Sequence, residues 1–251
     1  MNALGHLTAK AMRVYTPQPL TVGETAVLEP TAAHHLVVVC RCRAGDRVVL
    51  FNGDGAVYAG TLAPPVNAKQ CTVSIDDVAH PDVESPLAVS LIQAIGKGDR
   101  MDWAIQKAVE LGVASITPLI SERVTIKLDP KRAEKRQQRW QSIVVNACEQ
   151  SGRVSVPPVH PPMTLAAFSP PPAQVTYHLD PQAEAGLSTR RPNAPITLLV
   201  GPEGGFSADE VSHLQASGSQ GVRLGPRILR TETAGVACLA AMQALWGDFL
   251  K

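Results

Sequence analysis

The sequence predicts an α/β protein of two unequal domains, a small β-barrel followed by a larger domain with a mainly parallel sheet. Short β-type runs separated by turn residues fill the first third of the chain, whereas apolar strands alternate with helical patterns after residue 87. Residues 80–86 between these parts are rich in amino acids that interrupt strands and helices. The length of 251 residues also exceeds that of one ordinary domain.

The small β domain is expected over residues 12–80. Its β-type runs lie at 12–15, 37–39, 46–51, 57–62 and 71–75. Asn52-Gly53-Asp54-Gly55 indicates a hairpin between two of these runs, because Asn and Gly tolerate positive φ. Cys40 and Cys42 are expected to alternate in a strand, which puts both side chains on one face. Residues 1–11 lack such patterning and are expected to form a disordered extension.

The α/β domain is expected over residues 87–251. Nearly continuous apolar runs predict buried strands at 87–95, 114–120, 175–179, 196–200 and 221–224. Helix signals predict helices from Asp99 to Gly112, from Asp129-Pro130 to Gly152, from the capping box Ser207–Glu210 to Gly218, and over residues 233–249. The last helix is apolar nearly all round, so we expect it to pack inside the protein or against a second subunit.

Composition narrows the class of protein. Hydrophobic residues make up 45% and charged residues 18%, as in a globular protein with a sizeable core. The formal net charge of +1 gives no overall positive field that would indicate a nucleic-acid partner, so such a partner requires a local patch. Five cysteines without a C-x-x-C pair favour reduced thiols. No apolar run is long enough to span a membrane and no signal peptide is evident, so we expect a cytoplasmic protein.

Two glycine-rich loops follow predicted strand ends, where ligands of parallel sheets normally bind. Residues 201–206 follow the strand that ends at Val200, and residues 225–234 follow the strand that ends at Leu224. Glycine in such loops permits positive φ and lets the backbone approach a ligand closely. One isolated loop of this kind is more often a tight turn, but two loops at consecutive strand ends, both carrying charged residues, favour a binding site.

Common nucleotide-binding, metal and hydrolase motifs are missing from the sequence. Residues 95–98 do not form a P-loop, and no G-x-G-x-x-G follows a strand. No G-x-S-x-G elbow supports an α/β-hydrolase. The adjacent pair His34-His35 lacks nearby ligands at a metal-binding spacing. ATP, dinucleotide and metal chemistry therefore have little support.

Five segments carry a family resemblance when taken together. They are residues 97–102, 107–112, 148–153, 201–206 with Glu210, and 224–234. In this order, over about residues 12–250, they resemble the RsmE family of 16S rRNA (uracil(1498)-N(3))-methyltransferases of the SPOUT superfamily. The resemblance implies a PUA-like β-barrel followed by a SPOUT domain with a trefoil knot that binds S-adenosylmethionine. It also implies a homodimer without a metal, which methylates N3 of one uridine near the decoding centre.

The resemblance also assigns site residues. The cofactor-binding stretches of the family fall on Leu199, Val200, Gly201, Gly204, Leu224, Gly225, Leu229, Arg230, Thr231, Glu232 and Thr233. The family is usually alanine-rich where this chain has residues 235–238, so we expect packing differences there. A neutral adenine held by backbone groups needs no phosphate cradle, and a methyl group on a sulfonium needs no metal.

Catalysis then requires alignment of uracil N3 with the methyl group and removal of the N3 proton. We expect Arg230 to stabilise the developing uracil anion through its carbonyl oxygens, and Glu232 or Glu203 to orient the base or the cofactor. Glu232 has an equally good alternative role, which is to complement the positive N-terminus of its helix.

Basic residues gather locally despite the near-zero net charge. Residues 121–140 hold seven basic and three acidic residues, and smaller basic groups lie on the barrel and near residue 97. The RNA-binding candidates are Arg13, Arg41, Arg43, Lys97, Arg100, Arg132, Arg136 and Arg139. A charge run alone is usually a solvated helix face, but the resemblance favours a surface that contacts RNA phosphates.

Two other classes of protein are compatible with parts of this pattern. A SPOUT methyltransferase could act on another RNA, such as tRNA, because a fold does not define a substrate. A non-catalytic RNA-binding or assembly factor could keep the PUA-like module. The two intact glycine-rich loops disfavour the second class, because a pure binder needs no cofactor pocket.

Overall fold

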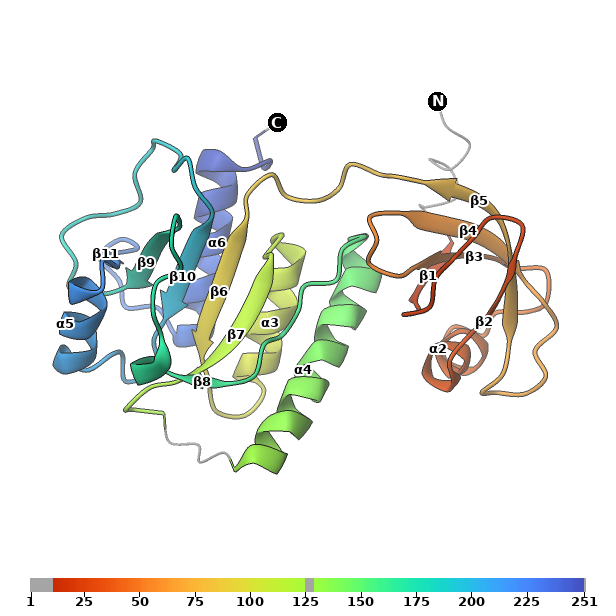
Figure 1. Cartoon of the computed structure of the whole chain (residues 1–251), viewed down its shortest axis with the longest axis horizontal. Coiled ribbons are helices and arrows are strands. Elements are labelled where there is room, and N and C mark those ends of the chain that lie inside the picture. Colours follow the sequence, from red (N-terminus) through yellow and green to blue (C-terminus); the bar gives the residue numbers. More distant parts are fainter. Residues whose placement is uncertain (1–10, 125–128, 251) are drawn as a thin grey trace. The chain divides into compact units, whose positions relative to one another are not determined.

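The computed structural model describes residues 11–124 and 129–250 and forms two compact units (Figure 1). The described chain up to Glu84 and the segment Cys148–Val156 form the first unit. The second unit consists of Ser85–Ala147 and the chain from Pro157 onwards. Residues 1–10 of the expected disordered extension lie outside the described residues.

The first unit is built on a five-stranded sheet with the order β1-β3-β4-β5-β2 (Figure 1). Its strands are β1 (Met12–Tyr15), β2 (Thr25–Val27), β3 (Arg47–Phe51), β4 (Val57–Leu62) and β5 (Thr72–Ala79). β1 and β3 are parallel, and the other pairs are antiparallel. The predicted hairpin joins β3 to β4, with Gly53 and Gly55 both at φ 93°. Val48, Leu50 and Leu62 of these strands lie in the core.

The predicted strand at residues 37–39 is wrong. These residues belong to a π-helical turn, His35–Val39, which continues the short helix α2 (Pro30–His34). Ala33 and Leu36 are wholly buried at helical spacing, whereas Val38 and Val39 are exposed. The valine run has high β propensity, but tertiary burial of Leu36 determines the conformation. Cys40 and Cys42 consequently lie after this turn and not in a strand.

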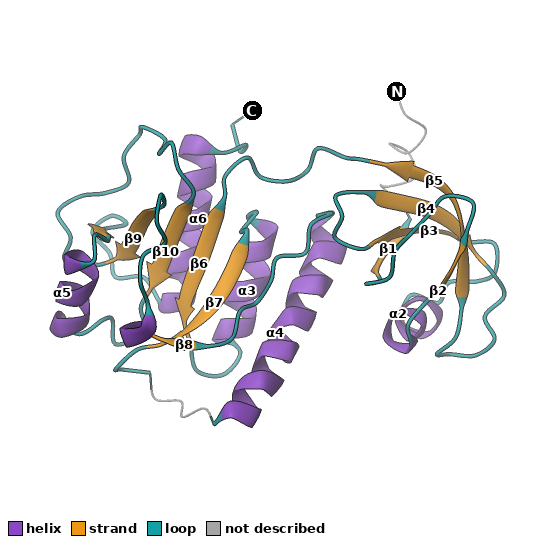
Figure 2. Ribbon diagram, viewed as in Figure 1, coloured by secondary structure: helices purple, strands orange, loops and turns teal. Residues whose placement is uncertain are grey.

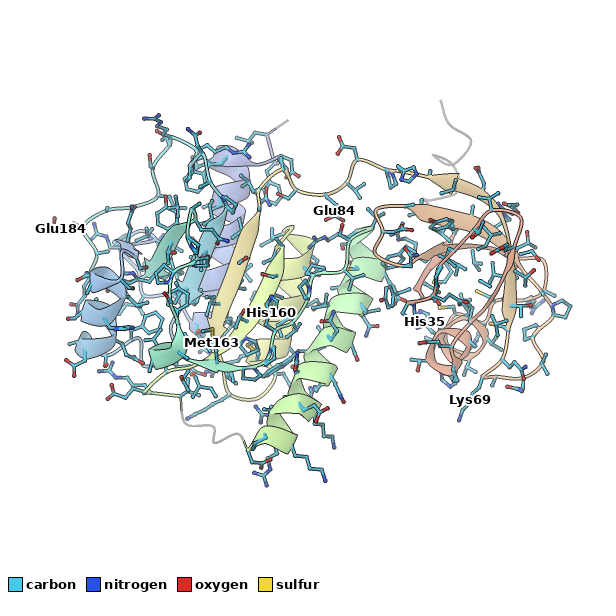
Figure 3. The ribbon with its side chains drawn as sticks, in the orientation of Figure 1. His35, Lys69, Glu84, His160, Met163 and Glu184 are labelled. Carbon is cyan, nitrogen blue, oxygen red and sulfur yellow. The ribbon has the colours of Figure 1, made fainter. Side chains whose placement is uncertain are left out.

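The end of helix α4 (Pro130–Ser151) and the residues after it pack into the first unit. Glu84, labelled in Figure 3, accepts hydrogen bonds from Arg153 Nη2 at 2.7 Å and Nε at 3.0 Å. It also accepts the backbone N–H groups of Val154 and Ser155 at 2.9 and 3.0 Å. Burial raises the pKa of Glu84, but these hydrogen bonds and the charge of Arg153 outweigh it and hold the pKa below the ordinary value.

Glu84→Gln is expected to lower the free energy of unfolding by roughly 1.5–3 kcal/mol at neutral pH, since the negative charge and one of the two acceptor oxygens are removed. Because the folded-state pKa of Glu84 is depressed, its contribution is complete above the ordinary value of 4.5 and is lost as pH falls through the folded value. Denaturant titrations of both proteins from pH 7 down to acid test this. The difference between wild type and variant should shrink below pH 4.5; a pH-independent difference would contradict the assignment.

The second unit contains a six-stranded sheet with the order β11-β9-β10-β6-β7-β8, in which every pairing is parallel (Figure 1). Its strands are β6 (Val89–Ala94), β7 (Ser115–Ile120), β8 (Met163–Thr164), β9 (Val175–Leu179), β10 (Ile196–Val200) and β11 (Gln220–Val222). Leu91, Ile116 and Leu198 are almost wholly buried. The predicted parallel sheet is therefore confirmed, and β8 is an additional short strand.

This unit also contains helices α3 (Arg100–Glu110), α5 (Ala208–Ala216) and α6 (Thr231–Trp246), most of α4, and the 3₁₀ turn Leu165–Ala167. α3 and α6 pack together behind the sheet in the view of Figure 2. The capping box of Ser207 and Glu210 is confirmed, and Asp129 caps α4 by accepting the backbone N–H of Arg132 at 2.9 Å. Asp99 precedes α3, but its side chain forms no capping hydrogen bond. No helix within the described ranges is long and apolar enough to cross a membrane.

Candidate active site

A cavity of about 420 Å³ lies at the carboxyl ends of β9, β10 and β11. Three segments that follow these strands form its walls, namely residues 179–182, residues 200–203 with Gly205, and residues 222–229, together with Thr231 and Ala234 at the start of α6. Ligand sites of parallel sheets are normally found at such strand ends. The volume is within the usual range of about 300–1,000 Å³ for small-molecule sites.

The cavity brings together six of the predicted cofactor-binding residues. Val200, Gly201, Leu224, Gly225, Leu229 and Thr231 line it, as does the predicted catalytic residue Glu203. Leu199, Gly204, Arg230, Glu232 and Thr233 do not line it. Leu199 is wholly buried because it faces the hydrophobic core beneath the sheet end. The remaining four lie in the same loops or in the first turn of α6, beside residues that do line the cavity.

The first wall, residues 179–182, was missed by the sequence prediction. A signal for it was present, because Asp180 directly follows a predicted strand. Asp180 accepts the backbone N–H of Gln182 at 2.8 Å, and its own N–H donates to the carbonyl of Val222 at 3.0 Å. These contacts tie the ends of β9 and β11 together at the cavity.

The glycines of the two predicted loops have specific conformations. Gly205 and Gly225 have φ values of 69° and 67°, which disfavour residues with a Cβ. The N–H of Gly205 donates to the carbonyl of Pro202 at 2.8 Å and closes a tight turn. Arg123 Nη1 donates to the carbonyl of Gly204 at 2.6 Å. The first loop is therefore held both from within and by a side chain that follows β7.

The two predicted catalytic carboxylates share one cation. Arg100 Nη1 lies 2.7 Å from Glu203 Oε1, and Arg100 Nε lies 3.8 Å from Glu232 Oε1. The backbone N–H of Lys97 also donates to Glu203, at 3.2 Å. Burial raises the pKa of Glu203, but backbone hydrogen bonds from Glu203 itself and from Lys97, with Arg100, outweigh it and lower the pKa. Glu203 is therefore ionised at neutral pH.

Arg230 occupies a different environment. It lies at the N-cap position of α6, is exposed, and its side chain has no hydrogen-bond or ion-pair partner among the described residues. The same holds for the exposed arginines Arg223 and Arg227, which line the cavity. Three arginines whose side chains have no partner among the described residues thus lie at or beside one loop.

Several predicted RNA-binding residues have internal partners. Arg139 pairs with Asp102, Arg132 pairs with Asp129 at 3.2 Å, and Arg100 is shared by the two carboxylates described above. Arg13 is partly buried, donates to the carbonyl of Arg153 at 2.9 Å and lies 5.0 Å from the ring centroid of Phe51. In contrast, the side chains of Arg41, Arg43, Lys97 and Arg136 have no partner in the described part of the chain. Residues 125–128 of the basic stretch lie outside the described residues.

No group of three or more His, Cys, Asp or Glu residues within 11–124 and 129–250 is arranged to hold a metal ion. Cys40 and Cys42, which were expected to share one face of a strand, do not belong to such a group. Burial raises the pKa of both thiols, with nearby acidic groups adding to it.

Comparisons with known proteins agree with this geometry. A family model described as RNA methyltransferase domain matches residues 83–243, and one described as RNA methyltransferase PUA domain matches residues 28–76. The chain is 32% identical to ribosomal RNA small subunit methyltransferase E of Buchnera aphidicola, over 94% of this chain and 97% of that protein. It is 33% identical to the protein of the same name from Synechocystis, over 94% and 78%.

Two solved structures are similar throughout. One is a ribosomal RNA small subunit methyltransferase E from Neisseria gonorrhoeae bound to S-adenosyl methionine, with a TM-score of 0.88, 42% identity and coverage of 95% of this chain and 99% of that one. The other is a putative methyltransferase from Legionella pneumophila in complex with the cofactor SAM, with a TM-score of 0.90, 38% identity and coverage of 96% and 100%.

Proposed function

The chain belongs to the family of ribosomal RNA small subunit methyltransferase E, and from this premise we propose that it transfers a methyl group from S-adenosylmethionine to N3 of one uridine in 16S rRNA. It is an S-adenosylmethionine-dependent rRNA methyltransferase with a PUA-like first domain. The observation that carries the proposal is the cavity at three strand ends, which is lined by most of the glycine-loop residues assigned to the cofactor. The target that we propose is uracil 1498, near the decoding centre.

The cavity suits S-adenosylmethionine chemically. Leu179, Val200, Leu224 and Leu229 offer apolar surface to a flat adenine, while the glycine loops expose backbone groups to its edge. Asp180 and Glu203 place carboxylates at the wall, where they suit a ligand that carries sulfonium and ammonium charges. The cofactor supplies an already activated methyl group.

The chain's own residues must orient uracil and stabilise the negative charge that develops when N3 is deprotonated. Arg230 has a positive charge with no internal partner among the described residues, so we propose that it donates to the uracil carbonyl oxygens while the N3 proton passes to solvent. N3 then takes the methyl group from the cofactor, and S-adenosylhomocysteine leaves. Glu203 and Glu232 are fixed by Arg100, and we propose that they orient the base or the cofactor. Leu199, Gly204 and Thr233 support the residues that line the cavity.

We also propose that the second domain contains a trefoil knot and that the protein forms a homodimer. After leaving β10 the chain passes through α5 and β11, and Thr231 Oγ1 then donates to the carbonyl of Gly201 at 2.5 Å, 30 residues earlier. This return supports a knotted arrangement of the two loops. Trp103 on α3 and Leu245 on α6 are 42% and 44% exposed, which supports an apolar dimer surface on this helix pair. We place the enzyme in the cytoplasm, with its rRNA substrate.

Nucleoside analysis tests the proposed activity. Small-subunit rRNA from a strain lacking the gene should lose 3-methyluridine at one position, and the purified protein with S-adenosylmethionine should restore it. Persistence of 3-methyluridine in the deletion strain would refute the assignment. Restored methylation of tRNA, with none on small-subunit rRNA, would instead identify a related enzyme with another substrate.

RNA affinity should depend most on arginines that have no internal partner. Arg223→Ala together with Arg227→Ala is expected to weaken rRNA binding and to reduce the slope of log K against log salt by about 0.7 for each phosphate that the variant no longer neutralises. Arg132→Ala with Arg139→Ala should have a smaller effect, because these side chains must first leave Asp129 and Asp102. Filter binding over a range of salt concentrations measures both pairs. Equal slopes for the two variants would contradict the prediction.

A further inference from the structure

Gln93 is an amide buried beside the cavity loops, on a strand to which no site residue was assigned. It lies on β6, next to β10 in the sheet, and is 1% exposed. Its neighbours Ile92 and Ala94 are buried apolar residues. Gln93 Nε2 lies 3.0 Å from Thr231 Oγ1 and 3.3 Å from the carbonyl of Ala94. Burying an amide in an apolar strand costs free energy unless its donor and acceptor groups form hydrogen bonds.

The direction of these hydrogen bonds follows from their partners. The carbonyl of Gly201 can only accept, so the hydroxyl of Thr231, 2.5 Å away, uses its single proton there. Thr231 Oγ1 must then accept from Gln93, which fixes Nε2 of the amide towards Thr231. The three groups form a chain from β6 through the first turn of α6 to the loop after β10.

The position of Gln93 Oε1 explains why residue 235 is a glycine. With Nε2 facing Thr231, Oε1 points away from it and has no hydrogen-bond partner among the described residues. A Cβ on Gly235 would lie 2.9 Å from this oxygen and 3.4 Å from Val200 Cγ2. An alanine at this position would therefore force the amide out of its present position.

We propose that Gln93 is a positioning residue of the cofactor site. Through Thr231 it fixes the carbonyl of Gly201, and so sets the separation of two walls of the cavity, the loop after β10 and the start of α6. Gly235 is part of the same device, because it leaves room for the amide. The identity of the ligand, S-adenosylmethionine, rests on the proposed function. The geometry of Gln93, Thr231 and Gly201 does not depend on it.

Matched variants separate positioning from simple stability. Thr231→Val removes the hydroxyl that relays the bond, whereas Thr231→Ser keeps it. Thr197→Val is the control, because Thr197 is also buried and its hydroxyl is hydrogen-bonded to Gln174 at 2.7 Å, at the opposite end of β10. Gln93→Met keeps the length of the side chain but removes the donor.

Three measurements test the proposal. Calorimetry with S-adenosylmethionine should show Kd raised on the order of 10-fold by Thr231→Val and Gln93→Met, and by less for Thr231→Ser, with little change for the control Thr197→Val. Hydrogen exchange of the ligand-free protein should be faster in residues 201–206 for the first two variants only. In assays with RNA, the KM for the cofactor should rise while kcat at saturation stays near the wild-type value.

A double-mutant cycle tests the role of Gly235. Gly235→Ala should weaken cofactor binding in the wild-type background and be nearly neutral in a Gln93→Ala background. The proposal is overturned if Thr231→Val affects loop exchange no more than Thr197→Val does, or if Gly235→Ala is additive with Gln93→Ala. Failure of the wild-type protein to bind S-adenosylmethionine would refute the proposed function instead, since loop exchange is measured without ligand.

Discussion

Replacement of Arg230 by alanine is expected to lower kcat by on the order of 10²–10³-fold, the usual cost of losing one donor to a developing anion. Arg230 is exposed, and its side chain has no partner among the described residues. It does not line the cavity, whereas Leu229 and Thr231 on either side of it do. Its charge is therefore available to a base that approaches the cavity, and its removal should leave the affinity for S-adenosylmethionine almost unchanged.

Single-turnover methylation of small-subunit rRNA, with calorimetry for the cofactor, measures the two effects separately. Arg190→Ala is a matched control, because Arg190 is also exposed and its side chain has no partner in the described chain. Arg190 adjoins Arg191, which donates to the carbonyl of Trp246 at the last residue of α6, whereas Arg230 precedes the first. Arg190→Ala should keep normal turnover. Weaker cofactor binding with normal turnover at saturation in Arg230→Ala would remove Arg230 from catalysis.

The parallel sheet could be predicted from sequence because its determinants are local. Each strand is a short apolar run bounded by turn residues, and caps such as Asp129 and Ser207 act on N–H groups three residues away. The turn at His35–Val39 could not be predicted in this way, because burial of Leu36 in the core outweighs the β propensity of the valines. Asp99 shows the same limit, since a good capping residue in sequence makes no cap in the fold.

The glycine-rich loops of the candidate site could be predicted from the sequence, whereas Gln93, which has no distinctive local pattern, was missed. Gly201 and Gly225 are conspicuous after strands, and both line the cavity. Gln93 is an unremarkable polar residue in an apolar run, and its partner Thr231 is 138 residues away. Nothing local distinguishes it from a tolerated surface position.

Charge is the property that sequence describes least well in this protein. A count of arginines treats Arg100 and Arg230 alike. In the fold, Arg100 lies between two carboxylates contributed by segments more than 100 residues away, whereas Arg230 has no partner within the described residues. An arginine that already has an internal ion pair gains less binding free energy from a phosphate than an unpaired arginine does. The pairing of each arginine is therefore a better guide to RNA-binding candidates than the number of arginines.

Gly225→Val is expected to abolish stabilisation by the cofactor. Gly225 lines the cavity at φ 67°, and open space surrounds the position of an added Cβ, so a valine would combine backbone strain with bulk at the wall. S-adenosylmethionine at 100 times its Kd should stabilise the wild-type protein by about 2.7 kcal/mol. If the valine raises Kd by about 100-fold or more, the same concentration gives at most about 0.4 kcal/mol.

Gly218→Val separates strain from obstruction. Gly218 ends α5 at φ 92°, and it too has open space around the position of an added Cβ, but it does not line the cavity. Both variants should carry a similar strain, on the order of 1–2 kcal/mol, and melt at lower temperature than wild type without ligand. Only Gly218→Val should regain the wild-type increase in melting temperature when S-adenosylmethionine is added. A full ligand-induced increase in Gly225→Val would show that the second glycine loop does not contact the cofactor.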